Sequence, residues 1–467
     1  MTFQSSPDCR YSAGKADMRC HWCSAAGESL LGSCGVCGRW GRSYSYWEAA
    51  CGIANEVGLM MAECTCSAVL GAEPRPSGKA LLGYMELTRV ALERCATARA
   101  AIELMGSLAE EHGFHGNDPD TAESLAVIDK EEAWVFHILA DDSGASAIWA
   151  AQKVPDGHAA AVANQFVIRK IDLEDRSRSL YSDSALDVAE RLGLWERGTD
   201  FDFAACFSAG EARHCGYSGR RVWRALSLFA PSLQLQGEYT DLLTNPVYPF
   251  SVLPDAPITR SDFFSVMRDN YEGTKWEMSK QPAAGPFGVT DRWDGAPSTT
   301  MSNAHFERPI GVYRMAYSYI GEAAEEPLFY FGPHVSTTAV YCPVLCKQEI
   351  CPAPLGRGSV KAVDRKSAFW AFRRAKATAL GLCWDRCLPV IRERQAAWEA
   401  QGLAIVADGA LPLPEKAALL CELAEAVVAD WADLDDELMV RFSDGWEQLS
   451  TVEEDGSTPH YKPLKYP

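Results

Sequence analysis

The sequence predicts an α+β fold, in which antiparallel strands and helices occupy separate stretches of the chain. Residues 51–68 alternate on both sides of a tight Asn-Glu-Val-Gly turn, the pattern of a β-hairpin. A helical pattern over 84–112 is then followed by strand pairs with short turns. Helical patterns fill most of 367–448. Because repeating strand–helix–strand units are missing from this order, a doubly wound parallel sheet is disfavoured.

The first long helix is predicted to run from Tyr84 to His112, with Gly113 as its stop signal. Its apolar residues recur at three- and four-residue steps and therefore share one face: Leu87, Val90, Ala91, Ala98, Ile102, Met105 and Leu108. A loop rich in proline and glycine, Glu73–Gly78, separates this helix from the hairpin.

Four strands are expected after the helix, in two pairs joined by short polar turns. They are Ser124–Ile128 with Ala133–Leu139, and Ala147–Val154 with Ala160–Ile168. Further on, helical patterns cover Ser184–Leu192 and a stretch that begins at Gly219, strand patterns return from Leu328 to Val344, and the C-terminal part from Ser367 is mostly helical.

Composition limits the function classes. The chain has 467 residues, 47% of them hydrophobic, and a formal net charge of -19 from 44 basic and 63 acidic residues. Such a surface repels phosphate backbones and anionic lipids, so neither nucleic-acid binding nor membrane binding is expected. No signal peptide and no apolar stretch of about 18 residues is visible, which favours a cytoplasmic location.

Three regions are expected along the chain. Residues 1–42 form an atypical Cys-rich segment with no helical or strand periodicity, a candidate for disorder. Residues 43–366 are expected to form the main domain. Residues 367–467 are expected to form a helical extension packed on it. The sequence does not indicate an oligomeric state.

Several segments together resemble the family of cysteine-type dipeptidases and secernins, which are N-terminal-nucleophile hydrolases. The resemblance begins with the hairpin at 51–68 and continues with further segments in family order: Leu87–Ile102, Glu132–Ile138, Val154–His158, Val162–Phe166, Met267–Thr274, Ala284–Gly288 and Ser367–Phe372. It implies a four-layer αββα sandwich in which an N-terminal cysteine, exposed by processing, attacks small peptides. The free α-amine next to such a thiol can serve as its base, so no separate histidine is required.

The resemblance also implies two site residues. Asn164, in Val-Ala-Asn-Gln-Phe, matches an asparagine of the oxyanion hole, where a neutral amide stabilises developing negative charge. Arg221 matches an arginine that orients the nucleophile's surroundings or a substrate carboxylate, although Arg224 is an alternative match. A turn asparagine and a surface arginine are the ordinary explanations of such residues. Glu63 and Thr65 are weaker candidates for lining the site.

The nucleophile itself is not identifiable. In the family, a Cys-Thr-Ser strand precedes the hairpin, and no such strand is recognisable before Gly52. Cys64-Thr65-Cys66 resembles a nucleophile motif but aligns with the second hairpin strand, so Cys64 is interpreted as a structural thiol. We therefore expect either a dipeptidase-like hydrolase, whose chain is truncated or inactive, or a secernin-like protein that binds without hydrolysis.

The chain has 17 cysteines, and two Cys-x-x-Cys pairs occur early, at Cys20 with Cys23 and at Cys34 with Cys37. Four thiolates at this separation can enclose a structural zinc ion. Incidental thiols explain the same spacing, and a redox or catalytic thiol is a further alternative. We expect no cofactor, with a structural zinc at these four cysteines as the alternative.

Overall fold

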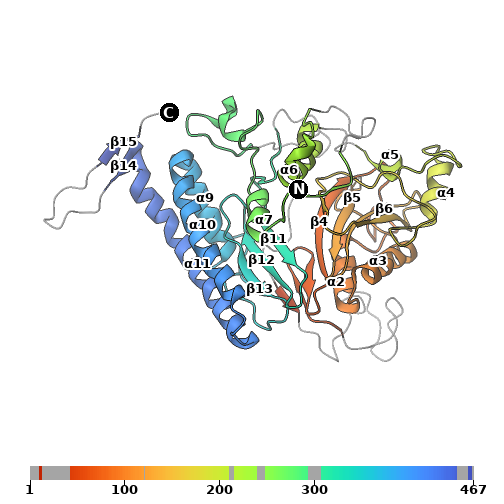
Figure 1. Cartoon of the computed structure of the whole chain (residues 1–467), viewed down its shortest axis with the longest axis horizontal. Coiled ribbons are helices and arrows are strands. Elements are labelled where there is room, and N and C mark those ends of the chain that lie inside the picture. Colours follow the sequence, from red (N-terminus) through yellow and green to blue (C-terminus); the bar gives the residue numbers. More distant parts are fainter. Residues whose placement is uncertain are drawn as a thin grey trace.

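The computed structural model describes residues 10–12, 43–119, 121–209, 215–238, 248–292, 307–449 and 461–464. The fold is α+β, as predicted, with antiparallel sheets and several helices (Figure 1). Its largest sheet has eight strands in the order β1-β2-β3-β4-β5-β6-β7-β9. These strands are β1 (Arg10–Ser12), β2 (Tyr46–Glu48), β3 (Gly52–Asn55), β4 (Met60–Ser67), β5 (Thr121–Ile128), β6 (Ala133–Ala140), β7 (Ala147–Val154) and β9 (Ser179–Tyr181).

The predicted hairpin at 51–68 is confirmed as β3 and β4, joined by a turn at residues 56–59. The Asn55 Oδ1 accepts the backbone N–H of Leu59 at 3.0 Å, which closes the turn. Each strand of the large sheet pairs antiparallel with its neighbours. Strand β1 falls within 1–42, where the sequence showed no strand periodicity, and the remainder of that segment lies outside the described residues.

Helices α2 (Tyr84–Arg94) and α3 (Ala98–His112) cover one face of this sheet. Fully buried side chains from both helices and from β5 to β7 form one cluster, with Ile102 and Phe136 among them. Helix α3 approaches β7 closely, because a Cβ at Gly106 would lie 2.4 Å from the Trp149 ring. The apolar face predicted for 84–112 is therefore the packed face.

The prediction of one continuous helix over 84–112 is wrong at Cys95–Thr97. The Asn55 Nδ2 donates to the carbonyls of Leu92 and Cys95, at 2.9 and 2.8 Å, which occupies acceptors that a continuing helix would use. The Thr97 Oγ1 then accepts the N–H of Ala100, and the carboxylate of Asp129 accepts the N–H of Ala98. The Asn55 side chain from β3 thus helps to end one helix, and the side chains of Thr97 and of Asp129, just after β5, start the next.

A second sheet contains β11 (Tyr317–Glu322), β12 (Leu328–Pro333) and β13 (Cys342–Leu345). The strand pattern predicted from Leu328 to Val344 is confirmed by β12 and β13, whereas β11 was not predicted. Helices α9 (Ala368–Gly381), α10 (Trp384–Ala407) and α11 (Leu413–Phe442) run beside this sheet, on the side of the molecule away from α2 and α3 (Figure 1). The predicted helical C-terminal part is confirmed by them.

One hydrophobic cluster connects the two sheets and the C-terminal helices. It contains Trp47 and Met60 from the large sheet, Phe329 from the second sheet, and Phe372 and Trp431 from the helices. The Trp47 and Phe329 rings meet edge to face at 5.7 Å, and the Phe372 and Trp431 rings stack at 4.9 Å. The helices therefore share a core with the preceding residues.

The prediction of a strand over Ala160–Ile168 is wrong beyond its first residue. Only β8 (Ala159–Ala160) forms there, paired with β10 (Ser251–Val252). Asn164 adopts a left-handed backbone, with φ 53°, which interrupts an extended strand. The N–H groups of Val167 and Ile168 donate to Nε2 of the buried His137 instead of to a neighbouring strand.

The remaining elements are short. They are α4 (Ser184–Arg191), α5 (Phe203–Phe207), the π-helical turn η2 (Cys215–Gly219), α6 (Arg220–Phe229), α7 (Arg260–Met267), β14 (Trp446–Gln448), β15 (Tyr461–Pro463) and four 3₁₀ turns at Pro231–Leu233, Met278–Lys280, Pro282–Ala284 and Ser443–Gly445. Among the described helices, none combines the length and the apolar character needed to span a membrane.

Candidate functional site

The structure brings Asn164 and Arg221 into direct contact, although 57 positions separate them in the chain. The Arg221 Nη2 donates to the Asn164 Oδ1 at 2.6 Å. On its other side, the Asn164 amide nitrogen donates to the backbone carbonyl of Thr65, near the end of β4. The amide therefore bridges the large sheet and α6, and its orientation is defined because the arginine can only donate.

The backbone of Asn164 takes part as well. Its N–H donates to the Cys64 Sγ at 3.0 Å, and its carbonyl accepts the Ser218 hydroxyl at 3.3 Å. The left-handed conformation directs these groups, and asparagine tolerates it better than most residues. Asn164 is thus held by main-chain and side-chain bonds together.

The geometry distinguishes between the two arginines that the sequence left open. Arg221 lies in the first turn of α6, and its Nε donates to the Tyr217 carbonyl at 2.8 Å. Arg224, one helical turn later, points to a different partner: its Nε lies 2.9 Å from both carboxylate oxygens of Asp269. Only Arg221 contacts Asn164.

Cys64 lies at this site, and the residue as a whole is half-buried. The Cys66 thiol, the Asn164 N–H and the Arg221 guanidinium together lower its pKa, in that order, and they outweigh burial and the nearby Glu63 carboxylate, which raise it. The alignment of Cys64 with the hairpin predicts a structural thiol, because a local alignment carries no information about a partner 100 positions away in the chain.

Glu63 and Thr65 do not line this site with their side chains. Successive residues of a strand face opposite sides, so both project away from the side of Cys64. The Thr65 hydroxyl donates to a Glu63 oxygen at 2.8 Å and lies 3.4 Å from an oxygen of Glu123. Glu123 is fully buried, and burial together with the Glu63 carboxylate raises its pKa well above the usual range. Of Glu63 and Thr65, only Thr65 contacts Asn164, and it does so through its backbone carbonyl.

No group of three or more potential metal-ligating side chains occurs within the described ranges. The four cysteines considered for zinc, Cys20, Cys23, Cys34 and Cys37, lie outside those ranges.

Comparison with known proteins agrees with the resemblance seen in the sequence. Residues 38–386 match peptidase family C69, so the match contains both Asn164 and Arg221. A probable dipeptidase of Latilactobacillus sakei is 25% identical over 182 residues. That alignment covers 39% of this chain and 35% of the relative, so the matched part is about a third of the relative's length. Because the family match extends over most of the sequence, the chain belongs to peptidase family C69.

Proposed function

We propose that this protein is a cysteine-type, dipeptidase-like hydrolase that cleaves small peptides by an N-terminal-nucleophile mechanism. The observation that carries the proposal is the contact of Asn164 with Arg221 beside the end of β4, within a chain of a peptidase family. The helices outside the two sheets are compatible with a four-layer αββα sandwich, which we propose as the architecture (Figure 1).

In this proposal, Asn164 stabilises the oxyanion that forms when a thiolate attacks a peptide carbonyl. Its amide nitrogen carries two hydrogens, and one is bonded to the Thr65 carbonyl. The second hydrogen has no acceptor among the described residues and is available to a substrate oxygen. Arg221 acts as the positioning residue, since its bond to the Asn164 Oδ1 prevents the amide from flipping.

The nucleophile in this mechanism is a cysteine whose own α-amine accepts the thiol proton. Attack forms an acyl-thioester, the peptide C–N bond breaks, and the amine leaves with the proton. Water then hydrolyses the thioester and restores the thiol. Sequencing the 5′ end of the transcript tests whether a Cys-Thr strand precedes the hairpin, and such a strand would favour hydrolysis.

The alternative is a secernin-like protein that binds its partners without hydrolysis. One observation favours it: Asn164 and Arg221 are bonded to one another and to the backbone carbonyls of Thr65 and Tyr217, as a purely structural network would be. The same scaffold would then keep the Asn164–Arg221 contact as a binding or structural feature.

Hydrolysis of a dipeptide panel by the purified chain separates the two functions. We expect thiol-dependent cleavage, and Asn164→Ala should reduce kcat by about 10²- to 10³-fold, the effect of removing an oxyanion donor. Arg221→Gln removes the bond that positions Asn164 and should also lower kcat. Arg191→Gln is its matched control, because Arg191 pairs with Asp142 at the surface. Absence of both cleavage and thiol-dependent labelling in the folded protein would reject the hydrolase and leave the binding protein.

A further inference from the structure

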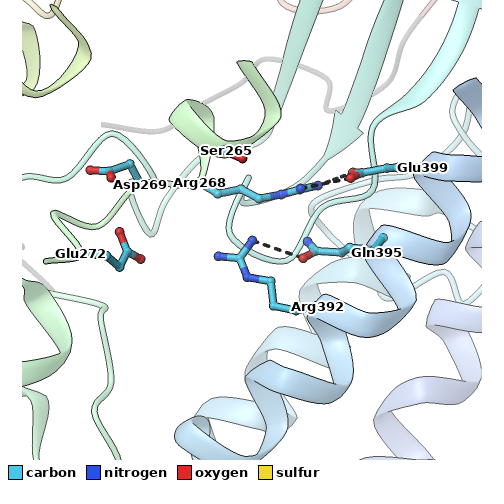
Figure 2. A pocket seen from close by; sticks show the side chains of 8 residues that line it. Ser265, Arg268, Asp269, Glu272, Arg392, Gln395 and Glu399 are labelled. Atoms are coloured by element: carbon cyan, nitrogen blue, oxygen red, sulfur yellow. Dashed lines mark hydrogen bonds and ion pairs between the residues drawn. The ribbon is translucent and has the colours of Figure 1, made fainter. Parts of the chain in front are cut away.

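A polar pocket of about 410 Å³ lies between α10 and the residues that follow α7 (Figure 2). A volume of this size is within the range of small-molecule sites. The lining residues that decide its charge are Arg268, Asp269 and Glu272 on one side, and Arg392 and Glu399 from α10 on the other. The balance among these five side chains indicates what the pocket can hold.

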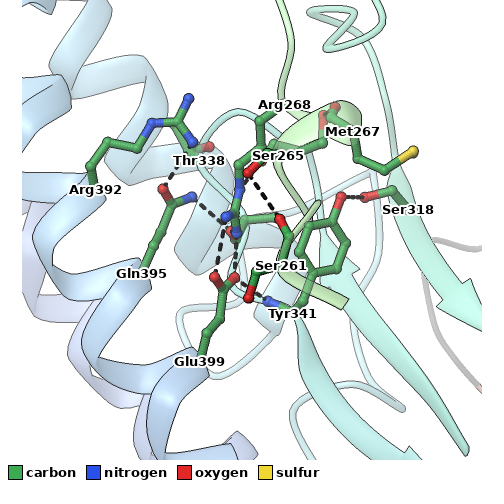
Figure 3. A network of polar contacts seen from close by, with 12 residues as sticks. Ser261, Ser265, Met267, Arg268, Ser318, Thr338, Tyr341, Arg392, Gln395 and Glu399 are labelled. Atoms are coloured by element: carbon green, nitrogen blue, oxygen red, sulfur yellow. Dashed lines mark hydrogen bonds and ion pairs between the residues drawn. The ribbon is translucent and has the colours of Figure 1, made fainter. Parts of the chain in front are cut away.

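Two of the charges cancel within a buried network. The Arg268 guanidinium donates to both oxygens of Glu399 (Figure 3). Its Nε lies 3.3 Å from the Ser336 carbonyl. The Tyr341 N–H donates to the same carboxylate at 3.0 Å, and its ring lies 5.0 Å below the guanidinium. Arg268 and Glu399 therefore form a neutral, fully bonded wall.

Asp269 is neutralised in the same way from outside the pocket. Both of its oxygens lie 2.9 Å from the Nε of Arg224, and the Arg224 Nη2 also donates to the Glu272 carbonyl at 2.8 Å. Since Arg221 is one turn earlier on α6, the same helix contacts the Asn164 site and the edge of this pocket.

Arg392 carries a positive charge that the carboxylates of Glu272 and Glu399 act on without direct contact. Its guanidinium donates to the Gln395 Oε1 at 3.3 Å and forms no ion pair with a carboxylate of the described residues. Gln395 is fully buried, and its amide nitrogen donates to the Ala339 carbonyl at 2.7 Å, so its oxygen is directed at Arg392. Burial and the neighbouring Arg268 lower the pKa of Arg392 to about 10, which still leaves it charged at neutral pH.

Glu272 supplies the opposite charge. One of its oxygens accepts the N–H of Asn270 at 2.7 Å, and the carboxylate forms no ion pair with a cation of the described residues. Figure 2 shows the charged ends of Glu272 and Arg392 facing one another across the pocket. A ligand with one positive and one negative end could therefore satisfy both.

We propose that this pocket binds a small zwitterion, with its carboxylate on Arg392 and its ammonium group on Glu272. A guanidinium pairs with a carboxylate through two parallel hydrogen bonds, which favours this orientation. That the zwitterion is an amino acid or a dipeptide rests on the proposed function. A dipeptidase has dipeptides as its substrates and amino acids as its products.

Isothermal titration with L-alanine and with L-alanyl-L-alanine tests this pocket, with alanine release measured in the same samples. We expect saturable binding of at least one of the two. N-acetyl-L-alanine lacks the ammonium group and L-alanine methyl ester lacks the carboxylate, so each should bind at least tenfold more weakly. Binding should also weaken as salt rises.

Arg392→Gln and Glu272→Gln should each weaken binding about tenfold or more. Arg392→Lys keeps the charge but not the paired donors, so its affinity for the zwitterion should lie between that of these variants and that of the wild type. Arg386→Gln and Glu393→Gln are matched controls, because both residues belong to α10 and neither lines the pocket. Circular dichroism verifies that each variant is folded.

Two results would overturn the zwitterion pocket: no binding of either probe at millimolar concentration, or equal binding by the folded Arg392 and Glu272 variants and the wild type. If hydrolysis is present while binding in the pocket is absent, only this inference fails. If binding is present while hydrolysis is absent, only the proposed function fails. The two outcomes are therefore distinguishable.

Discussion

Replacing Asn164 by alanine should destabilise the protein measurably, because this side chain bonds to two remote elements. The substitution leaves the Arg221 Nη2 and the Thr65 carbonyl without their present partner. A hydrogen bond to a charged group contributes about 1.5–3 kcal/mol and a neutral one about 0.5–1.5 kcal/mol. Water can replace part of both bonds at this half-buried position, so the lower ends of these ranges apply.

The backbone adds a second contribution at Asn164. Its φ of 53° is left-handed, where alanine is disfavoured by about 1–2 kcal/mol. Together with the lost bonds, we expect Asn164→Ala to lower the free energy of unfolding by about 3–4 kcal/mol. Asn164→Gly loses the same bonds but tolerates this conformation, so it should be more stable than the alanine variant by about 1 kcal/mol.

Urea denaturation followed by fluorescence and circular dichroism measures both variants against the wild type. Hydrolysis assays on the same preparations separate stability from activity, since both variants lack the amide and should be equally impaired. The reasoning is refuted if Asn164→Ala is as stable as the wild type, or if the glycine variant is the less stable of the two. Recovery of activity in Asn164→Gly would show that the alanine variant loses activity through backbone strain and not through loss of the amide.

Four further predictions concern other groups. Glu399→Ala leaves the buried Arg268 without its carboxylate and should cost about 3–5 kcal/mol in urea denaturation; a cost below 1 kcal/mol would contradict a buried ion pair here. Because the pKa of Cys64 is lowered and burial raises that of Cys51, iodoacetamide should label Cys64 before Cys51 as pH rises; mass spectrometry of the peptides decides this. Burial lowers the pKa of His137 to about 3, so the unfolded state binds the extra proton. The free energy of unfolding should therefore fall as pH drops from about 6.5 towards 3, by at most about 1.4 kcal/mol per pH unit, and His137→Gln should remove that slope. Metal analysis of the purified chain should find no zinc; stoichiometric zinc that is lost in Cys20→Ser would establish the zinc alternative.

Local patterns were sufficient for much of the fold. The turn after Asn55 and the alternation on either side predicted the β3–β4 hairpin, and apolar spacing predicted the packed face of α2 and α3. Burial of one face makes apolar residues recur every two positions in a strand and about every 3.6 positions in a helix. Such spacing can be seen within a short segment of the sequence. Family motifs in order along the chain predicted the peptidase family, which the match over 38–386 confirms.

The local pattern predicts the wrong element where a remote side chain bonds to the backbone of that segment. Asn55 and Asp129 capture backbone groups that a single helix over 84–112 would have used. His137 accepts the N–H groups of Val167 and Ile168 and so replaces a strand partner. Neither of these remote hydrogen bonds changes the spacing of apolar residues in the segment whose structure it alters, so the local sequence does not show it.

The sequence by itself predicted the β3–β4 hairpin, strands β5 to β7 and most of the long helices, and it named Asn164 and Arg221 as candidates. Only the tertiary structure decided that Arg221 rather than Arg224 contacts Asn164, that Cys64 lies against the same backbone, and that Arg392 and Glu272 face one pocket. The physical reason is that hydrogen bonds and ion pairs depend on distances of about 3 Å between groups tens of residues apart. Such distances are set by the packing of the sheets and helices, which no local pattern encodes.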